Sequence, residues 1–568
     1  MQVWHTLNKV LKNTIVTNVV RFFNKLIVIL HSKKYMKATF LKLLIVTILY
    51  TAFFGCAKRG TPTGGPKDSI PPVLVNAIPK IETINFKENK IKLYFNEYIK
   101  IKDVKKNLVI SPPQKYDPII TPAGTASKFI TIKILDTLDL NTTYSFNFGN
   151  SIVDNNEENK LENFKYVFST GTFIDSLKLS GKVTNPLIKK SLTNIDVMLY
   201  EYNSQFNDSI IYKQKPRYIA NTLDSTLFEI TNIREGKYLL IALQDANSNK
   251  IYNPEIDKIG FIGDTVTLPT DKTFDFTIFK EIPKLKVIKP KEVNKGHAIF
   301  GFEGNANDLI IELLTPTPED FKSEIVYEKN KDTINYWYTP FETDSLNFKV
   351  SKNNYSENFT LSLRSSKTDS LKITPSATGI LHLIDTFFVS TNTPIIDFNA
   401  SLIKITKKDS TEVLFTPIIS KSKNKLYLNF EKEINTDYNL EILPKTITDI
   451  YQISNDSISY KLKTKSPEDY GTINLSFENS KNTPLIVELL NEKEQVIRKA
   501  KTNNQQTISF ELLLPGKYLV RVTLDENNNG IWDTGNFLTR KQPETVKFFD
   551  QIIELRANYE LNETFNIN

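Results

Sequence analysis

Near the C-terminus of this 568-residue chain, side-chain oxygens recur at every second residue of the stretch DENNNGIWD (525–533). In a calcium-binding loop, alternate positions supply oxygen ligands and a glycine occupies the sharp turn. Those positions would here be held by Asp525, Asn527, Asn529, Ile531 (through its backbone carbonyl) and Asp533, with Gly530 at the turn. The last position holds Asn536 where such loops have a bidentate Glu. Asp and Asn also form turns without metal, because their side chains bond the nearby backbone. Two interpretations stay open, a weak calcium site and a polar turn between strands.

A weaker copy of this pattern lies in DANSNKIYNPEID (245–257), where Lys250 stands in place of the glycine. Its oxygen ligands would be Asp245, Asn247, Asn249 and Asp257. Ca²⁺ is the only cofactor that these patterns predict, and nothing in the rest of the chain requires another.

Residues that serve in catalysis are scarce elsewhere. The chain has four His and one Cys, and His5, His31 and Cys56 all lie in the first 56 residues. His297 and His382 remain, each in a strand-like context, with no Cys beside them to complete a zinc site. Neither a nucleophile motif such as G-x-S-x-G nor a phosphate-binding glycine loop occurs. The sequence therefore predicts a protein that is not an enzyme, with a hydrolase of unrecognised site as the remote alternative.

The formal charge of +8 does not indicate nucleic-acid binding. Residues 1–56 hold eight of the 72 Lys and Arg and no Asp or Glu, which leaves 64 basic residues against 64 acidic ones in the body. A nucleic-acid-binding body would carry a basic surface. The excess charge instead belongs to the N-terminal segment, and we expect no nucleic-acid partner.

That N-terminal segment has the pattern of a lipoprotein signal peptide. After Met36, two lysines precede a largely apolar run over 43–54, and Gly55 precedes Cys56, the only cysteine. A lone Cys directly after such a run is typical of a bacterial lipobox, in which the Cys is lipidated and becomes the mature N-terminus. The alternative is a Cys that stands by chance beside an ordinary signal-peptide cleavage site. We expect Met36 to be the start, 1–35 an upstream extension, and the membrane to be a partner through the N-terminal lipid.

From residue 73 onward, strand patterns dominate. Apolar and polar residues alternate in IKLYFNEYI (91–99), TYSFNFG (143–149) and KYLVRVTL (517–524), and turn residues interrupt at short intervals. The Gly- and Pro-rich segment after Cys56 reads as a flexible tether. The predicted fold class is all-β, a tandem series of β-sandwiches after a lipoprotein signal peptide and a flexible tether.

The body also repeats itself. Residues 140–170 align with 434–464, and residues 228–253 align with 510–533. The first alignment pairs Asn141 with Asn435, Tyr144 with Tyr438, Ile152 with Ile447, Asp154 with Asp449, Tyr166 with Tyr460 and Thr170 with Thr464. In the second, Gly236, Lys237, Tyr238 and Asp245 pair with Gly516, Lys517, Tyr518 and Asp525. A block of two domains therefore occurs twice, with an extra module between the copies.

Both blocks resemble known families. The first, with DSIPPVLVNAIPK, KLYFNEYI, VISPP and NTTYSFNFGNSIVD, is similar to the SbsA-type bacterial Ig-like domain. The second resembles prealbumin-like or carboxypeptidase-regulatory-like β-sandwiches, in which F-x-L-x-x-G-x-Y leads into a strand and an Asp/Asn loop. The whole chain is similar to Ig-like-domain lipoproteins of the Bacteroidetes, which implies an envelope lipoprotein and brings no catalytic residues. The expected domains are 1–55 (extension and signal peptide), 56–72 (lipidated Cys and tether), 73–174 (Ig-like), 175–282 (prealbumin-like), 283–375 (an additional β-sandwich), 376–466 (Ig-like) and 467–568 (prealbumin-like).

These features predict a non-catalytic, lipid-anchored protein of the cell envelope, most simply the outer membrane, acting as a scaffold or adhesion element. Whether it faces the periplasm or the cell surface is left open. The alternative is a module that binds a glycan, peptidoglycan or a secreted protein, for which exposed aromatic residues such as Tyr336, Trp337, Tyr338 or Trp532 would serve as stacking platforms. Besides the membrane, the expected partner is a glycan or an envelope protein.

Overall fold

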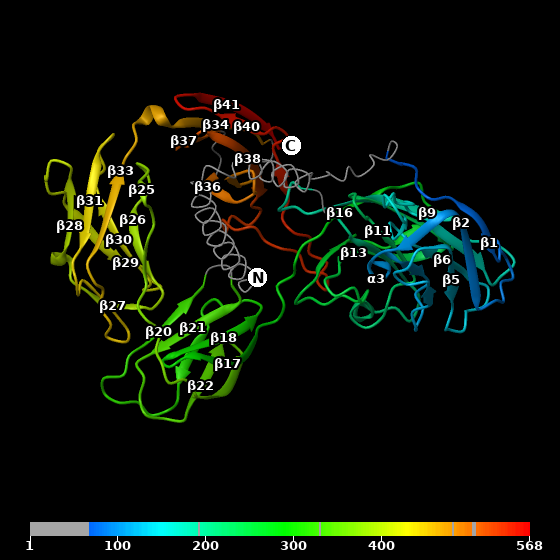
Figure 1. Ribbon diagram of the computed structural model, residues 1–568, viewed down its shortest axis with the longest axis horizontal. Coiled ribbons are helices and arrows are strands. Elements are labelled where there is room, and N and C mark those ends of the chain that lie inside the picture. Colours follow the sequence, from blue (N-terminus) through cyan, green and yellow to red (C-terminus); the bar gives the residue numbers. More distant parts are fainter. Residues whose placement is uncertain (1–66, 191–192, 329–330, 480–481, 503–506, 568) are drawn as a thin grey trace, which may run out of the picture. The chain divides into compact units, whose positions relative to one another are not determined.

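The computed structural model describes residues 67–190, 193–328, 331–479, 482–502 and 507–567, and everything below concerns the unit from Ile70 to Asn568. Nearly all regular structure in these residues is β-strand (Figure 1). The strands form five modules, which we name A (β1–β8), B (β9–β16), C (β17–β23), D (β24–β33) and E (β34–β41). The predicted all-β fold of tandem β-sandwiches is confirmed.

Module A packs a sheet of order β1-β2-β5-β4, with β7 beside β2, against a sheet of order β3-β6-β8. Its elements are β1 (Leu74–Ile78), β2 (Lys90–Ile101), α3 (Val104–Asn107), β3 (Val109–Ser111), β4 (Ile119–Thr121), β5 (Ser127–Lys133), β6 (Thr143–Asn147), β7 (Ile152–Asp154) and β8 (Lys165–Ser169). The alternating residues of β2 and β6 point into the core, where Ile91, Leu93 and Phe146 are fully buried. The period-2 pattern therefore predicted these strands and their inward faces correctly.

Module D repeats this topology, with sheets β24-β26-β30-β29 and β25-β33-β31-β28 and the pair β27-β32. Its elements are β24 (Ile373–Pro375), β25 (Gly379–Ile380), β26 (Phe387–Thr391), β27 (Ile395–Phe398), η2 (Ala400–Leu402), β28 (Ile403–Lys407), β29 (Phe415–Ile419), β30 (Lys425–Phe430), β31 (Asp437–Ile442), β32 (Ile447–Asp449), β33 (Ile458–Lys463) and η3 (Pro467–Asp469), which leads into module E. The aligned tyrosines bond alike: Tyr144 Oη accepts the Asp139 N–H at 2.9 Å, and Tyr438 Oη accepts the Glu433 N–H at 2.7 Å. The repeat is therefore structural as well as sequential.

Module B packs a sheet of order β11-β10-β13-β14, with β15 beside β13, against a sheet of order β12-β9-β16. Its elements are β9 (Leu177–Thr184), β10 (Asp196–Glu201), η1 (Asp208–Tyr212), β11 (Tyr218–Asn221), β12 (Leu227–Ile233), β13 (Gly236–Gln244), β14 (Lys258–Phe261), β15 (Val266–Leu268) and β16 (Phe274–Thr277). Residues 238–243 of β13 are buried on both faces of the sheet. One face packs on the sandwich core, and the other belongs to a second apolar cluster.

Module E repeats the topology of module B strand for strand, with sheets β37-β34-β41 and β36-β35-β38-β39 and with β40 beside β38. Its elements are β34 (Gly471–Glu478), β35 (Leu485–Leu490), β36 (Val496–Thr502), β37 (Thr507–Leu513), β38 (Gly516–Leu524), β39 (Val546–Phe548), β40 (Ile553–Leu555) and β41 (Glu560–Asn566). In both modules the last strand, β16 or β41, pairs in parallel with the first, β9 or β34.

Module C is a sandwich of the sheets β17-β18-β21-β20 and β19-β22-β23. Its strands are β17 (Lys286–Asn294), β18 (His297–Glu303), β19 (Ile310–Leu313), β20 (Ser323–Tyr327), β21 (Thr333–Tyr338), β22 (Ser345–Lys352) and β23 (Tyr355–Ser362). The next strand, Ile373–Pro375, pairs with β26 of module D. The boundary expected after residue 375 therefore falls before Ile373, because this short strand forms the edge of the following sheet.

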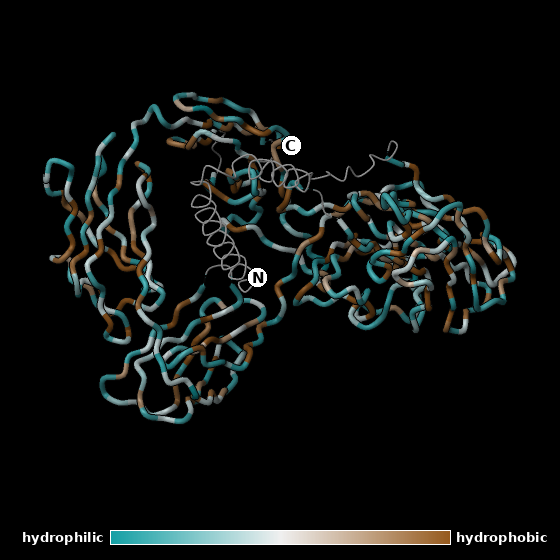
Figure 2. Tube along the Cα trace, viewed as in Figure 1, coloured by the Kyte–Doolittle hydropathy of each residue, from teal (hydrophilic) through white to brown (hydrophobic). Residues whose placement is uncertain are grey.

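Hydrophobic and hydrophilic residues are interspersed along the strands of every module (Figure 2). Each module has its own buried apolar cluster, and Tyr518, Val520 and Val522 contribute the inward face of β38 as their spacing predicts. Polar side chains in the loops between strands can accept hydrogen bonds from the loop's own backbone N–H groups, and the two Asp/Asn stretches lie in such loops.

Candidate functional site

Cys56, the predicted lipidation site, and the signal peptide and most of the tether lie outside the described residues. Within the described residues, no helix is long and apolar enough to span a membrane. The predicted sites that can be described are the two Asp/Asn loops, the two histidines and the aromatic residues.

The second Asp/Asn loop follows β38 and is built around the buried carboxylate of Asp525. Its Oδ1 accepts the Asn529 N–H at 3.0 Å, and its Oδ2 accepts the Gly530 N–H at 2.7 Å. Asn529 Oδ1 in turn accepts the Ile531 N–H at 2.8 Å, and Asn527 Nδ2 donates to Asp533 Oδ2. Side-chain oxygens that alternate along the stretch therefore act as caps for successive backbone N–H groups.

A carboxylate that the sequence reasoning missed closes this loop. Glu544 is buried, its Oε1 accepts the Glu526 N–H at 3.1 Å, and its Oε2 accepts the Asp533 N–H at 3.0 Å. Its backbone carbonyl accepts the indole N–H of Trp532 at 3.0 Å. Burial, aided by the charges of Asp533 and Asp525, raises the pKa of Glu544. The first copy offered a signal for this role, since its pattern ends in an acidic residue, Asp257, that lies after the alternating Asp and Asn residues.

The first loop has the same construction. Asp245 Oδ2 accepts the Lys250 N–H at 2.7 Å, and Asn249 Oδ1 accepts the Ile251 N–H at 2.8 Å. The fully buried Asp257 accepts the N–H groups of Ala246 and Asn253 at 2.9 and 2.8 Å, the counterparts of Glu526 and Asp533. Asp245, Asn247 and Asn249 thus occupy the same positions as their aligned partners Asp525, Asn527 and Asn529. Asp257 takes the place that Glu544 has in the second loop.

A lysine ammonium stands beside each loop. Lys250 Nζ lies 2.6 Å from Asp196 Oδ2, where Asp196 is buried and Lys250 is half-buried. Burial raises the pKa of Asp196, Lys250 opposes that rise, and the neighbouring charge of Asp245 adds to it. In the second loop Lys501 from β36 reaches across, and its Nζ occupies the space where a side chain at Gly530 would begin. Any Ca²⁺ bound here would share the loop with a fixed positive charge.

The described residues contain no group of three or more His, Cys, Asp or Glu placed to hold a metal ion. Most loop oxygens already accept backbone N–H groups. Asp245 Oδ1 differs, because it is buried with no hydrogen-bond partner in the described residues. Calcium binding at Asp525, Asn527, Asn529, Ile531 and Asp533, or at the weaker first loop, stays a prediction.

The second loop also makes contact with module B. Between Asp533 and Glu544 the chain leaves the turn and lays Phe537, which is 0% exposed, in the apolar cluster on the outer face of the β11-β10-β13-β14 sheet. The Phe537 ring stands edge-on to Phe261 at 5.5 Å between centroids, and its backbone N–H donates to Glu281. We call residues 534–542 the clasp.

Polar contacts fix both ends of the clasp. Thr534 Oγ1 donates to the Lys280 carbonyl at 2.7 Å, and Gln542 Nε2 donates to the Phe261 carbonyl at 3.0 Å. Arg540 pairs with Asp208. A second set of contacts joins the same two modules: Arg521 Nη1 donates to the Leu187 carbonyl at 2.6 Å, Lys189 Nζ donates to the carbonyls of Phe549 and Asp550, and the N–H groups of Lys189 and Lys190 donate to Glu494.

The aromatic residues named as stacking platforms are not exposed. Tyr336, Trp337 and Tyr338 are all buried, and Trp532 packs against the cluster that holds Phe537. His382 is half-buried and hydrogen-bonds the Tyr470 hydroxyl at 3.1 Å, and His297 stacks on Trp337. The condition under which these aromatics would bind sugars, exposure of their faces, is therefore not met.

Comparison with known proteins agrees with this architecture at its N-terminal end. Residues 68–170, which make up module A, match the model of the bacterial Ig-like domain. None of the curated proteins compared with the chain matches it. The fold and this match together define a protein of tandem β-sandwiches in which module A matches the bacterial Ig-like domain. Module D shares the topology of module A, while the prealbumin-like resemblance of modules B and E stays a prediction.

Solved structures give weaker likenesses. Domains A168–A170 of titin are 14% identical, with 42% of this chain and 91% of that chain covered and a TM-score of 0.13. Domains 1–6 of the surface layer protein SbsC are 12% identical, with 86% and 67% covered and a TM-score of 0.15. The Bacillus anthracis TIE protein is 10% identical, with 88% and 76% covered and a TM-score of 0.15. Likenesses of this size say nothing about what the chain binds or does.

Proposed function

We propose that this chain is a lipid-anchored protein of the cell envelope whose β-sandwich modules act as a non-catalytic scaffold or adhesion element. The observation that carries the proposal is the duplication of a whole two-module block, A with B and D with E, down to matching strand order. Repeating a block multiplies length and surface, which serves a scaffold, whereas an active site needs one constellation of groups.

The use of polar residues supports the same function. Asp525, Glu544 and Asp257 are the buried carboxylates of the loops, and each is engaged by backbone N–H groups. Carboxylates held in this way stabilise a turn, which supports a structural role for them. The contacts between modules B and E further support a scaffold, because they join residues that lie 254 and 334 positions apart in sequence.

The anchor can be tested by metabolic labelling with a palmitate analogue. We expect the label on the wild-type chain and none on Cys56→Ala, with Cys56→Ala still produced at its unprocessed length. Label retained by Cys56→Ala, or absent from the wild type, would contradict the anchor. An outer-membrane location is proposed on the lipobox alone, and fractionation of the labelled cells tests it.

Proteolysis of intact cells then tests which side of the membrane the modules face. It separates an adhesion element at the cell surface from a scaffold in the periplasm. Digestion of modules A–E from outside supports an adhesion element at the surface, and full protection supports a scaffold facing the periplasm. The partner of such an element, a glycan, peptidoglycan or an envelope protein, stays a prediction.

A further inference from the structure

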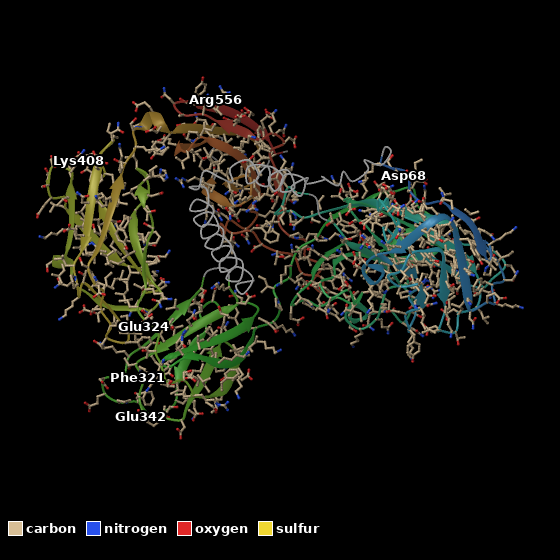
Figure 3. The ribbon with its side chains drawn as sticks, in the orientation of Figure 1. Asp68, Phe321, Glu324, Glu342, Lys408 and Arg556 are labelled. Carbon is tan, nitrogen blue, oxygen red and sulfur yellow. The ribbon has the colours of Figure 1, made fainter. Side chains whose placement is uncertain are left out.

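A cavity of about 400 Å³ lies where module C meets module D, and His297 is part of its lining. Its polar lining includes His297 of β18, Asn335 of β21, Glu328 and Asp369 from module C and the segment after it, and Asn424 from module D. Val326, Trp337 and Pro394 supply an apolar wall. The two modules are in contact here through Trp337, Ile450 and Tyr451 and through the ion pair of Lys423 with Glu324, the β20 residue labelled in Figure 3.

A chain of hydrogen bonds fixes the tautomer of His297. Asn335 Nδ2 donates to Glu328 Oε1 at 2.8 Å, so Asn335 Oδ1 is left to accept from His297 Nε2, also at 2.8 Å. The ion pair with Lys331 and the bond from Asn335 lower the pKa of Glu328, which therefore stays an acceptor. The proton of the neutral ring consequently sits on Nε2, and Nδ1 carries a lone pair.

The Nδ1 lone pair has no partner. His297 is only 6% exposed, its ring lies flat on Trp337 at 3.5 Å between centroids, and burial lowers its pKa. Nδ1 is a buried atom with no hydrogen-bond partner in the described residues. The nearest carboxylate oxygen is Asp369 Oδ2 at 3.8 Å, which is likewise an acceptor. Two acceptors that face each other at this distance need a donor between them.

The surroundings indicate what kind of donor would fit. Asp369 is held in place by Asn294, whose Nδ2 donates to Oδ1 at 2.7 Å, so Oδ2 stays available. The hydroxyl of Tyr451, next to Trp337, is also buried with no partner in the described residues. Among the described residues, two carboxylates line the cavity and no Lys or Arg does. The charge of Glu328 is already paired with Lys331, so the site offers two acceptors, His297 Nδ1 and Asp369 Oδ2, with the negative charge of Asp369 and an apolar wall beside them.

We propose that this cavity binds the primary ammonium group of an alkylamine, with the ammonium between His297 Nδ1 and Asp369 Oδ2. An ammonium carries three N–H donors and a positive charge, so one group satisfies both acceptors and offsets the carboxylate. The methylene stem lies against Val326, Trp337 and Pro394. The source is either a free diamine or the side chain of a lysine in a peptide. The inference goes beyond the scaffold function and does not depend on the lipid anchor.

Calorimetric titration of the full chain in detergent tests the proposal with two probes, 1,4-diaminobutane and Nα-acetyl-lysine amide. The Nε-acetylated form of the second probe is the negative control, because it keeps the stem and loses the charge. We expect binding heat from at least one free amine and none from the acetylated form. A response to only one of the two probes identifies the source.

The variant that tests the site is Asp369→Asn, which keeps the acceptor for Asn294 and removes the charge. Losing one charge-assisted hydrogen bond should weaken the affinity by roughly tenfold or more. The matched control is Asp320→Asn, an exposed carboxylate of the same module outside the cavity lining, which should leave the affinity within about twofold, as expected for a screened surface charge. Circular dichroism checks that both variants fold.

Three results would overturn the proposal: no heat from either amine, equal heat from the acetylated control, or an affinity that Asp369→Asn leaves unchanged. The last result would mean an adventitious amine at a surface carboxylate. If Asp369→Asn does not fold, the comparison of free with acetylated lysine on the unaltered chain still decides. None of these outcomes touches the palmitate labelling, so failure here is distinct from failure of the scaffold proposal.

Discussion

The clasp buries one aromatic side chain in module B, so Phe537→Ala should open the clasp. Phe537 is fully buried among residues of module B although it belongs to the loop of module E. Its ring contacts Phe261, and the Arg540 guanidinium lies 4.2 Å from the ring centre. Replacing it with Ala removes this packing and leaves a space that the rigid sheet of module B cannot fill.

Truncating a buried Phe to Ala typically costs about 3–5 kcal/mol. The clasp can respond by lifting away, because residues 534–542 lie outside the strands of module E. A loss of about 3 kcal/mol at a factor of ten per 1.4 kcal/mol raises the open population roughly a hundredfold. The sandwich cores of both modules do not include Phe537 and should keep their own stability.

Native-state hydrogen exchange with peptide resolution measures this opening. The expected result is exchange accelerated about a hundredfold in 534–542 and in the 258–261 segment beneath it, with β9 and β34 unchanged. Leu538→Ala is the matched control, since Leu538 is the next residue, is 58% exposed, and should change exchange by less than threefold. Equal protection of 534–542 in the wild type and in Phe537→Ala would refute the reasoning, because the clasp would then be held by something other than this ring.

Further predictions concern the same loop and the buried histidine. Gly535→Ala should open the clasp as well, since a Cβ there would lie 2.5 Å from Phe279 Cζ, and the same exchange experiment detects it. Glu544→Ala should lower the free energy of unfolding of module E by about 2 kcal/mol in urea titrations, because two backbone N–H groups lose their acceptor, and Glu544→Gln should lower it less. Titration of the full chain with CaCl₂ should give binding heat and a raised melting temperature if the Asp525 loop binds calcium, and a flat trace would exclude that interpretation. Burial lowers the pKa of His297, so below about pH 6.5 this histidine is protonated in the unfolded chain and neutral in the native state. The free energy of unfolding should therefore fall as the pH drops below about 6.5, and urea titrations should show a smaller fall for His297→Asn.

Much of the fold was predictable because strands buried on one face leave a period of two in the sequence. The inward residues of β2, β6 and β38 follow that period, and the aligned tyrosines at 144 and 438 identified the duplicated block. The end of module C was less predictable, since Ile373–Pro375 is a short edge strand whose pairing partner follows it in the chain. Strand β13 also departs from alternation, because a second apolar cluster covers its outer face. Module B supplies most of that cluster itself, and Val109 of module A and Phe537 of module E complete it.

The candidate sites were predicted only in part, and the reason is that loops are closed by residues distant in sequence. The spacing of Asp525, Asn527 and Asn529 indicated a structured turn, but nothing local pointed to Glu544 as the residue that closes it. The ring of Trp337 read as a possible stacking platform, whereas His297 from the neighbouring strand covers one of its faces. A sequence states which side chains are available, and the register between strands decides which of them meet.

The two Asp/Asn loops differ in length, and this difference explains why module E contacts module B through its loop. Asp257 follows Asn253 by four residues, whereas Glu544 follows Asp533 by eleven, and yet each carboxylate makes the same pair of backbone hydrogen bonds. Closure of the turn therefore does not depend on the length of the chain between these two residues. The additional residues between Asp533 and Glu544 are consequently not needed to close the turn of module E. Those extra residues are the clasp, and their one fully buried side chain packs on module B. The loop that first suggested a metal site is a turn found in both copies of the repeated module, and in the second copy it extends a contact to the first.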